Sequence, residues 1–330
     1  MTATATQEKL VGQRLKRRED PRLVQGQARF MDDIKLPGMA YVKLLRSPVA
    51  HARIRNVDTS KAAAAPGVVA VFTGQDFADV NALPYAYQAA GVENFVNTPR
   101  ILALDEVHWV GDPIAAVVAE TPGQATDALE LIQLDLEGLP AVVDAEKTTH
   151  DGAPQLHENA ANNTAFTWTC GNESGTDEAL ANAEVRISQR LRNQRLIATP
   201  IETRGAIGQY DAGTDEYTFW LSSQAPHVHR LLMAAFVLGH PEEKIRVISP
   251  DMGGAFGSKI FMYTEYPLVG LLAKSIGRPV KWIETREEHA LASAQGRDHV
   301  TDLEVAATRD GKITGLKVTT WANMGAYLST

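Results

Sequence analysis

Residues 245–260, Ile-Arg-Val-Ile-Ser-Pro-Asp-Met-Gly-Gly-Ala-Phe-Gly-Ser-Lys-Ile, carry the pattern that decides the fold. The β-branched run at 245–248 predicts a buried strand that ends at Pro250, because proline has no N–H to donate to a ladder. Gly253, Gly254 and Gly257 follow, and the apolar segment 260–273 predicts a helix. Glycines let a backbone approach a ligand closely, and a helix start offers free N–H groups to an anionic or oxo group. The stretch therefore predicts either a ligand-binding corner or a tight turn without a ligand.

Two nucleotide-binding motifs are excluded at this loop. A Walker A motif needs Gly-Lys-Ser/Thr, whereas Ser258 precedes Lys259 here and Ile260 follows it. The three glycines also lack the spacing of the dinucleotide fingerprint GxGxxG. A nicotinamide-dependent enzyme is therefore disfavoured.

A second corner of the same kind lies upstream. Residues 219–223 alternate as a strand, and apolar residues recur at helical spacing in 228–239. Together, Ser-Ser-Gln-Ala-Pro-His at 222–227 and Asp-Met-Gly-Gly-Ala-Phe-Gly-Ser-Lys at 251–259 resemble the molybdenum subunit of the xanthine oxidase family, nearest to its aerobic carbon monoxide dehydrogenase branch. The stretches 12–26, 46–53 and 66–73 are similar to the same subunits, so the resemblance extends over essentially the whole chain.

The composition limits the classes of partner and compartment. The chain has 330 residues, of which 44% are hydrophobic and 22% charged, as expected for a globular protein of about two domains. A net charge of −8 argues against a nucleic-acid partner. Cys170 is the only cysteine, so this chain cannot form an internal disulfide or hold an iron–sulfur cluster, which needs about four thiolates. No apolar run of about 18 residues predicts a membrane span, and charged residues follow Arg17-Arg18 instead of an apolar signal, so a cytoplasmic protein is expected.

The order of predicted strands and helices along the chain indicates an α+β part followed by an α/β part. Residues 1–21 are expected to form an N-terminal arm, and residues 22–143 a domain that resembles the family's a/b hammerhead domain. Within it we expect a hairpin around Gly111-Asp112-Pro113, an irregular surface loop at 79–100 and a helix opened by the N-cap Thr121. Residues 144–183 are expected to connect it to residues 184–330, the first and incomplete part of a molybdopterin-binding domain. His157 and Glu158 lie in that connection and are expected to be a solvated pair, because a metal site needs more ligands.

The later part is expected to hold strands at 185–196, 217–223, 245–249 and 279–283 and a short helix at 287–294. Asp310-Gly311 predicts a hairpin between strands at 302–308 and 313–323.

The resemblance implies that the cofactor-binding residues are Gln224, Gly253, Gly254, Ala255, Phe256 and Gly257. The Gln224 amide would donate to an oxo group on molybdenum or contact the pterin; from its pattern alone it is an ordinary core amide satisfied by backbone. Phe256 is alternatively a packed core residue, and Lys259 is alternatively a solvated lysine, a phosphate ligand or a carboxylate partner.

Glu202 and Ile260 are the candidate substrate-pocket residues. Glu202 is either paired with Arg204 or exposed, and the resemblance makes it a structural or pocket-lining position. Purine-oxidising relatives carry a glutamate where this chain has Ile260. An apolar side chain cannot make that hydrogen bond, so an aldehyde, an aromatic N-heterocycle or carbon monoxide is favoured over xanthine.

By resemblance, the family inserts oxygen from water into a carbon centre. It uses molybdenum on a molybdopterin, expected here in the cytosine dinucleotide form, and sends electrons to [2Fe–2S] and FAD partner subunits. No catalytic residue is expected in this chain, because the general-base glutamate would lie beyond residue 330. Residues 324–330 resemble an interior point of the family's subunit, so we expect a split or truncated subunit whose partner is the C-terminal half. The alternative is a non-catalytic docking or assembly module of such a complex.

Overall fold

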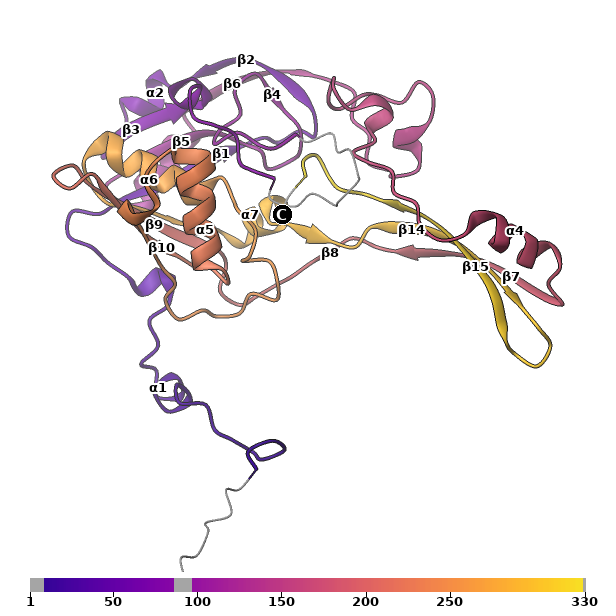
Figure 1. The fold of residues 1–330 in the computed structure, drawn as a ribbon. Helices are drawn as coiled ribbons and strands as arrows, with labels where there is room; N and C mark the ends of the chain where they lie inside the picture. Colours follow the sequence, from indigo (N-terminus) through magenta and orange to yellow (C-terminus); the bar gives the residue numbers. More distant parts are fainter. Residues whose placement is uncertain (1–8, 86–96, 329–330) are drawn as a thin grey trace, which may run out of the picture.

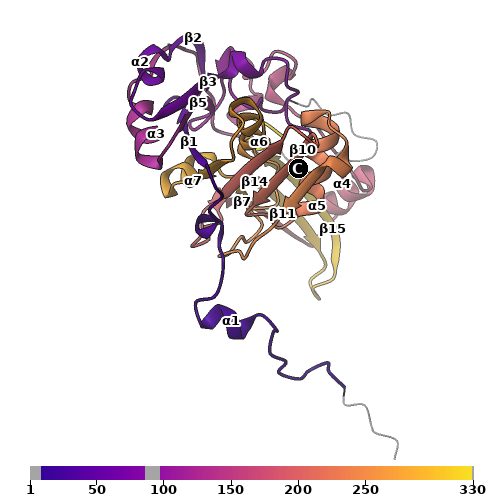
Figure 2. The same ribbon diagram turned by 90° about the vertical axis from the view of Figure 1, so that its left-hand side faces the viewer.

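The computed structural model describes residues 9–85 and 97–328 (Figure 1). Most of the predicted loop at 79–100 and the first part of the predicted N-terminal arm, residues 86–96 and 1–8, lie outside the described residues. In Figures 1 and 2 the segment through α1 (Asp20–Val24) extends away from a body built on one large sheet. None of the described helices is both long enough and apolar enough to cross a bilayer.

The large sheet contains seven strands in the order β11-β10-β9-β12-β1-β5-β3. Its strands are β1 (Ala40–Arg46), β3 (Val68–Thr73), β5 (Pro113–Ala119), β9 (Gly205–Asp211), β10 (Glu216–Leu221), β11 (Ile245–Ile248) and β12 (Val280–Ile283). β1 pairs with β12 and β10 with β11 in parallel, and the other neighbours are antiparallel. One sheet therefore joins strands from the first 120 residues to strands after residue 204.

Helix α6 (Glu265–Ile276) packs on this sheet and contains eight buried residues. Its approach to β9 requires Gly208, because a Cβ there would lie 2.4 Å from the Val269 carbonyl carbon. Phe219, Tyr266 and Trp282 are fully buried in the core between the sheet and its helices. Helix α5 (Pro226–Leu232), continued by a π-helical turn (Met233–Leu238), follows β10 as the spacing at 228–239 predicted.

A second sheet of three antiparallel strands, β4 (Glu106–Val107), β2 (Ala52–Asp58) and β6 (Gln133–Gly138), lies beside the first. The predicted hairpin at 111–113 is wrong: β4 pairs with β2, whereas β5 pairs with β1 and β3 in the large sheet. Every residue of β5 is buried, so both of its edges and both of its faces need neighbours, which a hairpin partner alone would not supply. The predicted N-cap is confirmed, because Thr121 Oγ1 accepts from the Gln124 N–H at the start of α3 (Pro122–Leu129).

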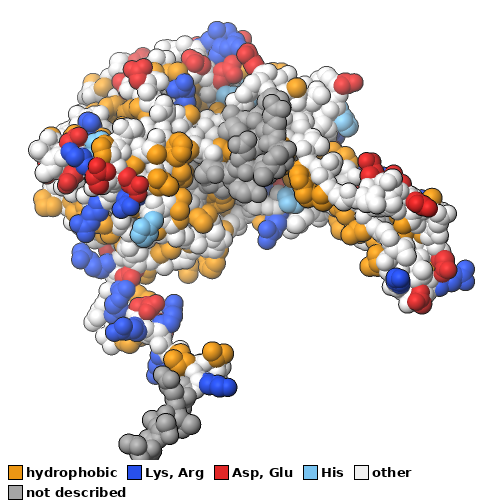
Figure 3. Space-filling model, viewed as in Figure 1, with side chains coloured by type: hydrophobic (Ala, Val, Ile, Leu, Met, Phe, Trp, Pro, Cys, Tyr) orange, Lys and Arg blue, Asp and Glu red, His pale blue; other side chains and the backbone are white. Residues whose placement is uncertain are grey.

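A third sheet projects from the body as an arm in Figure 1. It contains β7 (Val185–Asn193), β14 (His299–Ala307) and β15 (Ile313–Ala322), and the predicted hairpin between β14 and β15 is confirmed. Helix α4 (Glu173–Ala181), which the sequence did not predict, packs on the arm. Figure 3 shows hydrophobic side chains on the surface of the arm. Ile187 in β7 and Leu316 in β15 are both exposed. The remaining elements are α2 (Ser60–Ala63), α7 (Arg286–Ala292), β8 (Leu196–Ile197), β13 (Gln295–Gly296) and the 3₁₀ turns Met31–Asp33, Gly74–Phe77, Lys147–Thr149, Ala161–Asn163 and Glu242–Lys244.

Candidate cofactor-binding corner

The corner after β10 and the glycine loop after β11 meet through Gln224 and Lys259. The Gln224 N–H donates to the Lys259 carbonyl at 3.1 Å, and the Lys259 N–H donates to Gln224 Oε1 at 3.2 Å. Because β10 and β11 are parallel neighbours, both corners leave the sheet at the same edge. Gln224 is exposed, so the core-amide alternative is wrong, and its Nε2 group donates to none of the described residues.

The glycine loop, residues 251–260, adopts a backbone conformation with positive φ angles, which residues other than glycine rarely adopt. Gly254 and Gly257 have φ of +99° and +92°, and Phe256 has φ of +51°. The Phe256 side chain is 76% exposed, so the packed-core alternative is wrong. In the part of the chain that the structure describes, no hydrogen bond uses the N–H of Gly254, Ala255, Phe256 or Gly257. The loop therefore presents a run of free donors.

The helix after the loop begins later than the sequence predicted. Residues 260–264 are irregular, and α6 begins at Glu265. The backbone before it is held by side chains: Ser258 Oγ donates to the Ala255 carbonyl at 2.8 Å, and Tyr263 Oη donates to the Ser258 carbonyl at 2.6 Å. The buried carboxylate of Glu265 lies in the first turn of α6. The prediction that a helix start opens directly from the glycine loop is therefore wrong.

A salt bridge lies under the loop. The Lys259 ammonium donates to Glu202 Oε2 at 2.8 Å, and the Gly253 N–H donates to the same oxygen at 2.8 Å. Glu202 Oε1 accepts from the Met31 N–H at 3.1 Å. The Lys259 side chain is fully buried, so the solvated-lysine alternative is wrong. Burial lowers the pKa of Lys259, and Glu202 opposes that shift.

The alternative that pairs Glu202 with Arg204 is also wrong. Arg204 is fully buried and donates through Nε to Glu284 Oε1 at 2.9 Å and through Nη1 to Glu265 Oε2 at 3.2 Å. Its guanidinium carbon lies 3.6 Å from the centre of the Tyr263 ring. Burial alone opposes the charge of Arg204, but the two carboxylates raise its pKa overall. Arg204 thus joins β9, α6 and β12 behind the loop.

His229 holds the two corners together, and the sequence reasoning missed it. It is fully buried; its Nδ1 bonds Ser223 Oγ at 2.7 Å and its Nε2 bonds the carbonyls of Ile260 at 2.9 Å and Phe261 at 3.1 Å. Burial lowers the pKa of His229, so the ring is neutral near pH 7, with Nε2–H as donor and Nδ1 as acceptor. Its position three residues before the buried Leu232 on α5 is the signal that places it on the inner face.

The two parts of the chain match two domains of known proteins. Residues 156–330 match the molybdopterin cofactor-binding domain, and residues 25–140 match the a/b hammerhead domain of aldehyde oxidase and xanthine dehydrogenase. The chain belongs to the xanthine oxidase family.

Relatives in the xanthine oxidase family cover nearly all of this chain. The carbon monoxide dehydrogenase large chain of Hydrogenophaga pseudoflava is 37% identical over 322 residues, which are 94% of this chain and 39% of that protein. The nicotinate dehydrogenase large molybdopterin subunit of Eubacterium barkeri is 30% identical over 93% of this chain and 68% of that protein. The solved structure of reconstituted CO dehydrogenase from Oligotropha carboxidovorans superposes with a TM-score of 0.86 at 37% identity, over 94% of this chain and 39% of that one. The chain thus spans about two fifths of the carbon monoxide dehydrogenase chains.

In this member of the xanthine oxidase family, Ile260 lies at the end of the glycine loop and is 48% exposed. A cleft of about 360 Å³ lies at the upstream end of the glycine loop, where Phe30, Asp251 and Gly253 are among its lining residues. Asp251 accepts from both Nη groups of Arg22 at 2.5 Å and from the Arg29 N–H at 2.9 Å, and these bonds lower its pKa to about 2. The N-terminal segment is therefore attached to the start of the loop.

Proposed function

We propose that this chain forms the hammerhead part and the first molybdopterin-binding part of a molybdenum hydroxylase. In this proposal the corner of Gln224 and the glycine loop is one side of the cofactor site. The observation that carries the proposal is a set of donors at one edge of the sheet that bond none of the described residues, namely the Gln224 Nε2 group and the N–H groups of residues 254–257. A cofactor rich in oxygen atoms fits such donors, and glycine at 254 and 257 keeps Cβ atoms out of its way.

The residues of this chain would bind and orient the cofactor. When bound, the molybdenum cofactor supplies the chemistry that adds oxygen from water to a substrate carbon. Gln224 would donate from Nε2 to an oxygen-bearing group of the cofactor, while its Oε1 stays bonded to the loop backbone. Gly253 and Ala255 would shape the loop, and the exposed Phe256 side chain would cover the cofactor from the solvent side.

The remaining parts of the machinery are proposed outside residues 1–330. The general-base glutamate would come from a C-terminal half, and [2Fe–2S] clusters and FAD from partner subunits that receive the electrons. The single, exposed Cys170 supports this division, since a cluster needs about four thiolates. We propose the cytosine dinucleotide form of the cofactor and a cytoplasmic location from family resemblance.

Substrate preference would depend in part on Ile260. Its apolar side chain is half exposed beside the loop and offers no hydrogen bond to a purine. An aldehyde, an aromatic N-heterocycle or carbon monoxide suits it better than xanthine. Both carboxylate oxygens of Glu202 already accept hydrogen bonds, from Met31, Gly253 and Lys259. Glu202 would therefore support the glycine loop beside the substrate pocket and would not bind the substrate itself.

The test compares molybdenum and pterin content in the complex that this chain forms with its partner polypeptides. We expect Gln224→Ala to lower the molybdenum content per complex by about tenfold at limiting cofactor, because a hydrogen bond to a charged group contributes about 1.5–3 kcal/mol. The matched control is Gln133→Ala, an exposed glutamine at the start of β6 in the other sheet. A folded wild-type complex without pterin would refute the proposal and favour a docking or assembly module. Full molybdenum content in Gln224→Ala would refute the assigned role of that residue.

A further inference from the structure

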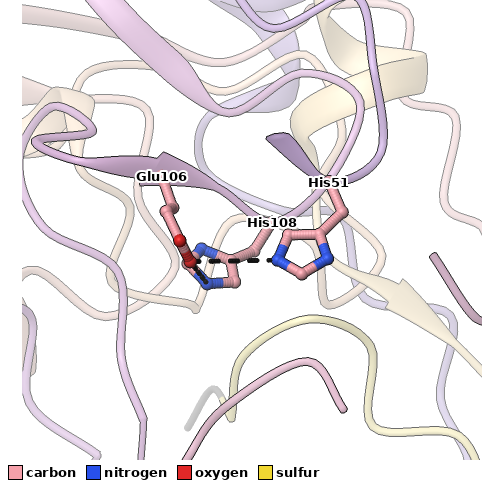
Figure 4. Close-up of side chains that lie close together, drawn as sticks. All are labelled: His51, Glu106 and His108. Carbon is pink, nitrogen blue, oxygen red and sulfur yellow. Dashed lines mark ion pairs between the residues drawn. The ribbon is translucent and has the colours of Figure 1, made fainter. Parts of the chain in front are cut away.

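His51, Glu106 and His108 lie together at one end of the three-stranded sheet, far from the glycine loop in the sequence. β2 and β4 are antiparallel, with Ala52 opposite Val107 and Arg53 opposite Glu106. Extending this register by one residue places His51 opposite His108, and the two rings stack with centroids 5.4 Å apart. Glu106 and His108 are two residues apart and therefore project to the same side of their strand. Figure 4 shows the Glu106 carboxylate facing both imidazole rings.

The three side chains direct one potential ligand atom each toward a common point. Glu106 Oε2 lies 3.9 Å from His51 Nε2 and 3.8 Å from His108 Nε2, and the three ligand atoms lie within 4.8 Å of one another. These distances are too long for hydrogen bonds. The second carboxylate oxygen, Oε1, accepts from Arg53 Nη2 at 3.3 Å, so Oε2 remains available.

The hydrogen bonding of His51 is a second, independent observation that points to a ligand at these atoms. The residue is 8% exposed, and its Nε2 is buried without a hydrogen-bond partner among the described residues. Its Nδ1 lies 2.8 Å from the Pro140 carbonyl, which can only accept, so Nδ1 carries the hydrogen. In the neutral ring Nε2 then presents a buried lone pair toward a carboxylate. A buried acceptor without a partner is unfavourable unless a cation or a donor satisfies it.

The surrounding contacts resemble the outer shell of a metal site. A histidine ligand usually bonds a carbonyl or another polar group through its second ring nitrogen, which orients the ring. His51 makes such a bond to Pro140, and His108 Nδ1 bonds Tyr327 Oη at 2.8 Å. His157 stacks on His108 at 4.7 Å between ring centroids, and its Nε2 bonds the Ala326 carbonyl at 2.6 Å. The prediction that His157 is solvated is therefore wrong: it packs against this cluster.

We propose that His51 Nε2, His108 Nε2 and Glu106 Oε2 bind one Zn²⁺ ion, with water as the fourth ligand. Zinc bonds of about 2.0–2.2 Å separate tetrahedral ligand atoms by about 3.3 Å. Glu106 Oε2 needs to approach each histidine nitrogen by about half an ångström from the observed separations. The two histidine nitrogens lie within 4.8 Å of each other and need to approach by at most about 1.5 Å, which rotations of the two side chains supply. Two imidazoles with one carboxylate suit zinc, whereas Mg²⁺ and Ca²⁺ select oxygen ligands. The ion would hold the ends of β2 and β4 together and remove the unpaired lone pair of His51.

The test is zinc binding by the full 330-residue chain after treatment with a chelator. We expect one Zn²⁺ per chain, measured by competition with a chromophoric chelator and by metal analysis after gel filtration. Glu106→Gln and His108→Gln should each weaken zinc binding at least tenfold. The matched control His150→Gln changes an exposed histidine outside the cluster and should bind zinc as wild type does. Bound Co²⁺ should give the intense visible absorption of a tetrahedral site in wild type and in His150→Gln, but not in Glu106→Gln or His108→Gln.

Glu106→Gln is the variant that keeps the proposal falsifiable if His108→Gln does not fold. Glutamine has nearly the shape of glutamate, and the Glu106 side chain is 31% exposed, so a circular dichroism spectrum equal to that of wild type is expected. The proposal is overturned if folded wild type retains no stoichiometric zinc. It is also overturned if folded Glu106→Gln binds zinc as tightly as wild type does.

Discussion

The buried salt bridge between Glu202 and Lys259 gives a quantitative test of how the glycine loop is held. In Glu202→Gln the remaining oxygen can still accept from Lys259 and Gly253, but the new NH₂ group faces the Met31 N–H, which now lacks an acceptor. An unsatisfied buried donor costs about 1–3 kcal/mol, and loss of the charged acceptor weakens a bond worth about 1.5–3 kcal/mol. The Lys259 cation also stays fully buried without its counter-charge. We therefore expect the substitution to lower the free energy of unfolding by about 3 kcal/mol.

Urea unfolding at pH 7, followed by tryptophan fluorescence and circular dichroism, measures this loss. A double-mutant cycle with Lys259→Met isolates the pair, because that variant removes the stranded cation. The double variant should lose less free energy of unfolding than the two single variants lose together. The difference should be about 1.5–3 kcal/mol, the size expected of a hydrogen bond to a charged group. The matched control is Glu120→Gln, which breaks a bidentate pair with Arg278 whose two bonds are both 2.7 Å long. That pair is exposed to solvent, so the unfolding midpoint should hardly move.

Hydrogen exchange adds a local readout to the same comparison. The Gly253 N–H donates to Glu202, so its exchange should accelerate in Glu202→Gln more than exchange in β10, which lies in the core sheet. The reasoning is refuted if Glu202→Gln and Glu120→Gln shift the midpoint equally. Strict additivity in the cycle with Lys259→Met would refute it too.

Two further predictions concern the groups behind the loop. Ser223→Ala should lower the free energy of unfolding by about 1–3 kcal/mol, because it leaves the buried His229 Nδ1 without a donor; Ser223→Thr, which keeps the hydroxyl, should recover most of the loss in the same urea titration. For Glu265, burial alone would raise the pKa, but Arg204 and Arg46 lower it to about 2 from 4.5. The unfolded chain thus binds more protons between these values, and the contribution of Glu265, about 3 kcal/mol, is present above pH 4.5 and lost as pH falls toward 2. Unfolding midpoints between pH 5 and about 3 should fall more steeply for wild type than for Glu265→Gln, and equal slopes would contradict the assignment.

Local signals in the sequence predicted several elements well. The strand at Ile245–Ile248, the helix after Pro226 and the turn at Asp310-Gly311 all appear in the structure, because each depends on neighbouring residues. The start of α6 was misplaced by five residues. Apolar residues at 260–264 favour a helix locally, but side chains from elsewhere bond this backbone and keep it irregular, as His229 does at residues 260 and 261.

Pairs distant in the sequence were not predictable in the same way. The sequence leaves Glu202 either paired with Arg204, two residues along the chain, or exposed, yet it bonds Lys259 across 57 residues. Residue type and spacing do not specify which of several buried charges will meet, since that depends on how strands are ordered in the sheet. The proximity of His51 and His108 likewise follows from the pairing of β2 with β4. These strands are not joined by a short turn, so no turn residues in the sequence indicate that they pair.

By itself, the sequence determined the family, the α+β and α/β character and the glycine loop, because motif identity, apolar periodicity and the backbone freedom of glycine are properties of short stretches. Only the tertiary structure decided that β1 lies parallel to β12, which places strands about 240 residues apart side by side in one sheet. It also decided which buried charges are paired and which donors stay free at the edge of β10 and β11. The physical reason is that hydrogen bonds and ion pairs form between groups that packing brings within about 3 Å, whatever their separation along the chain.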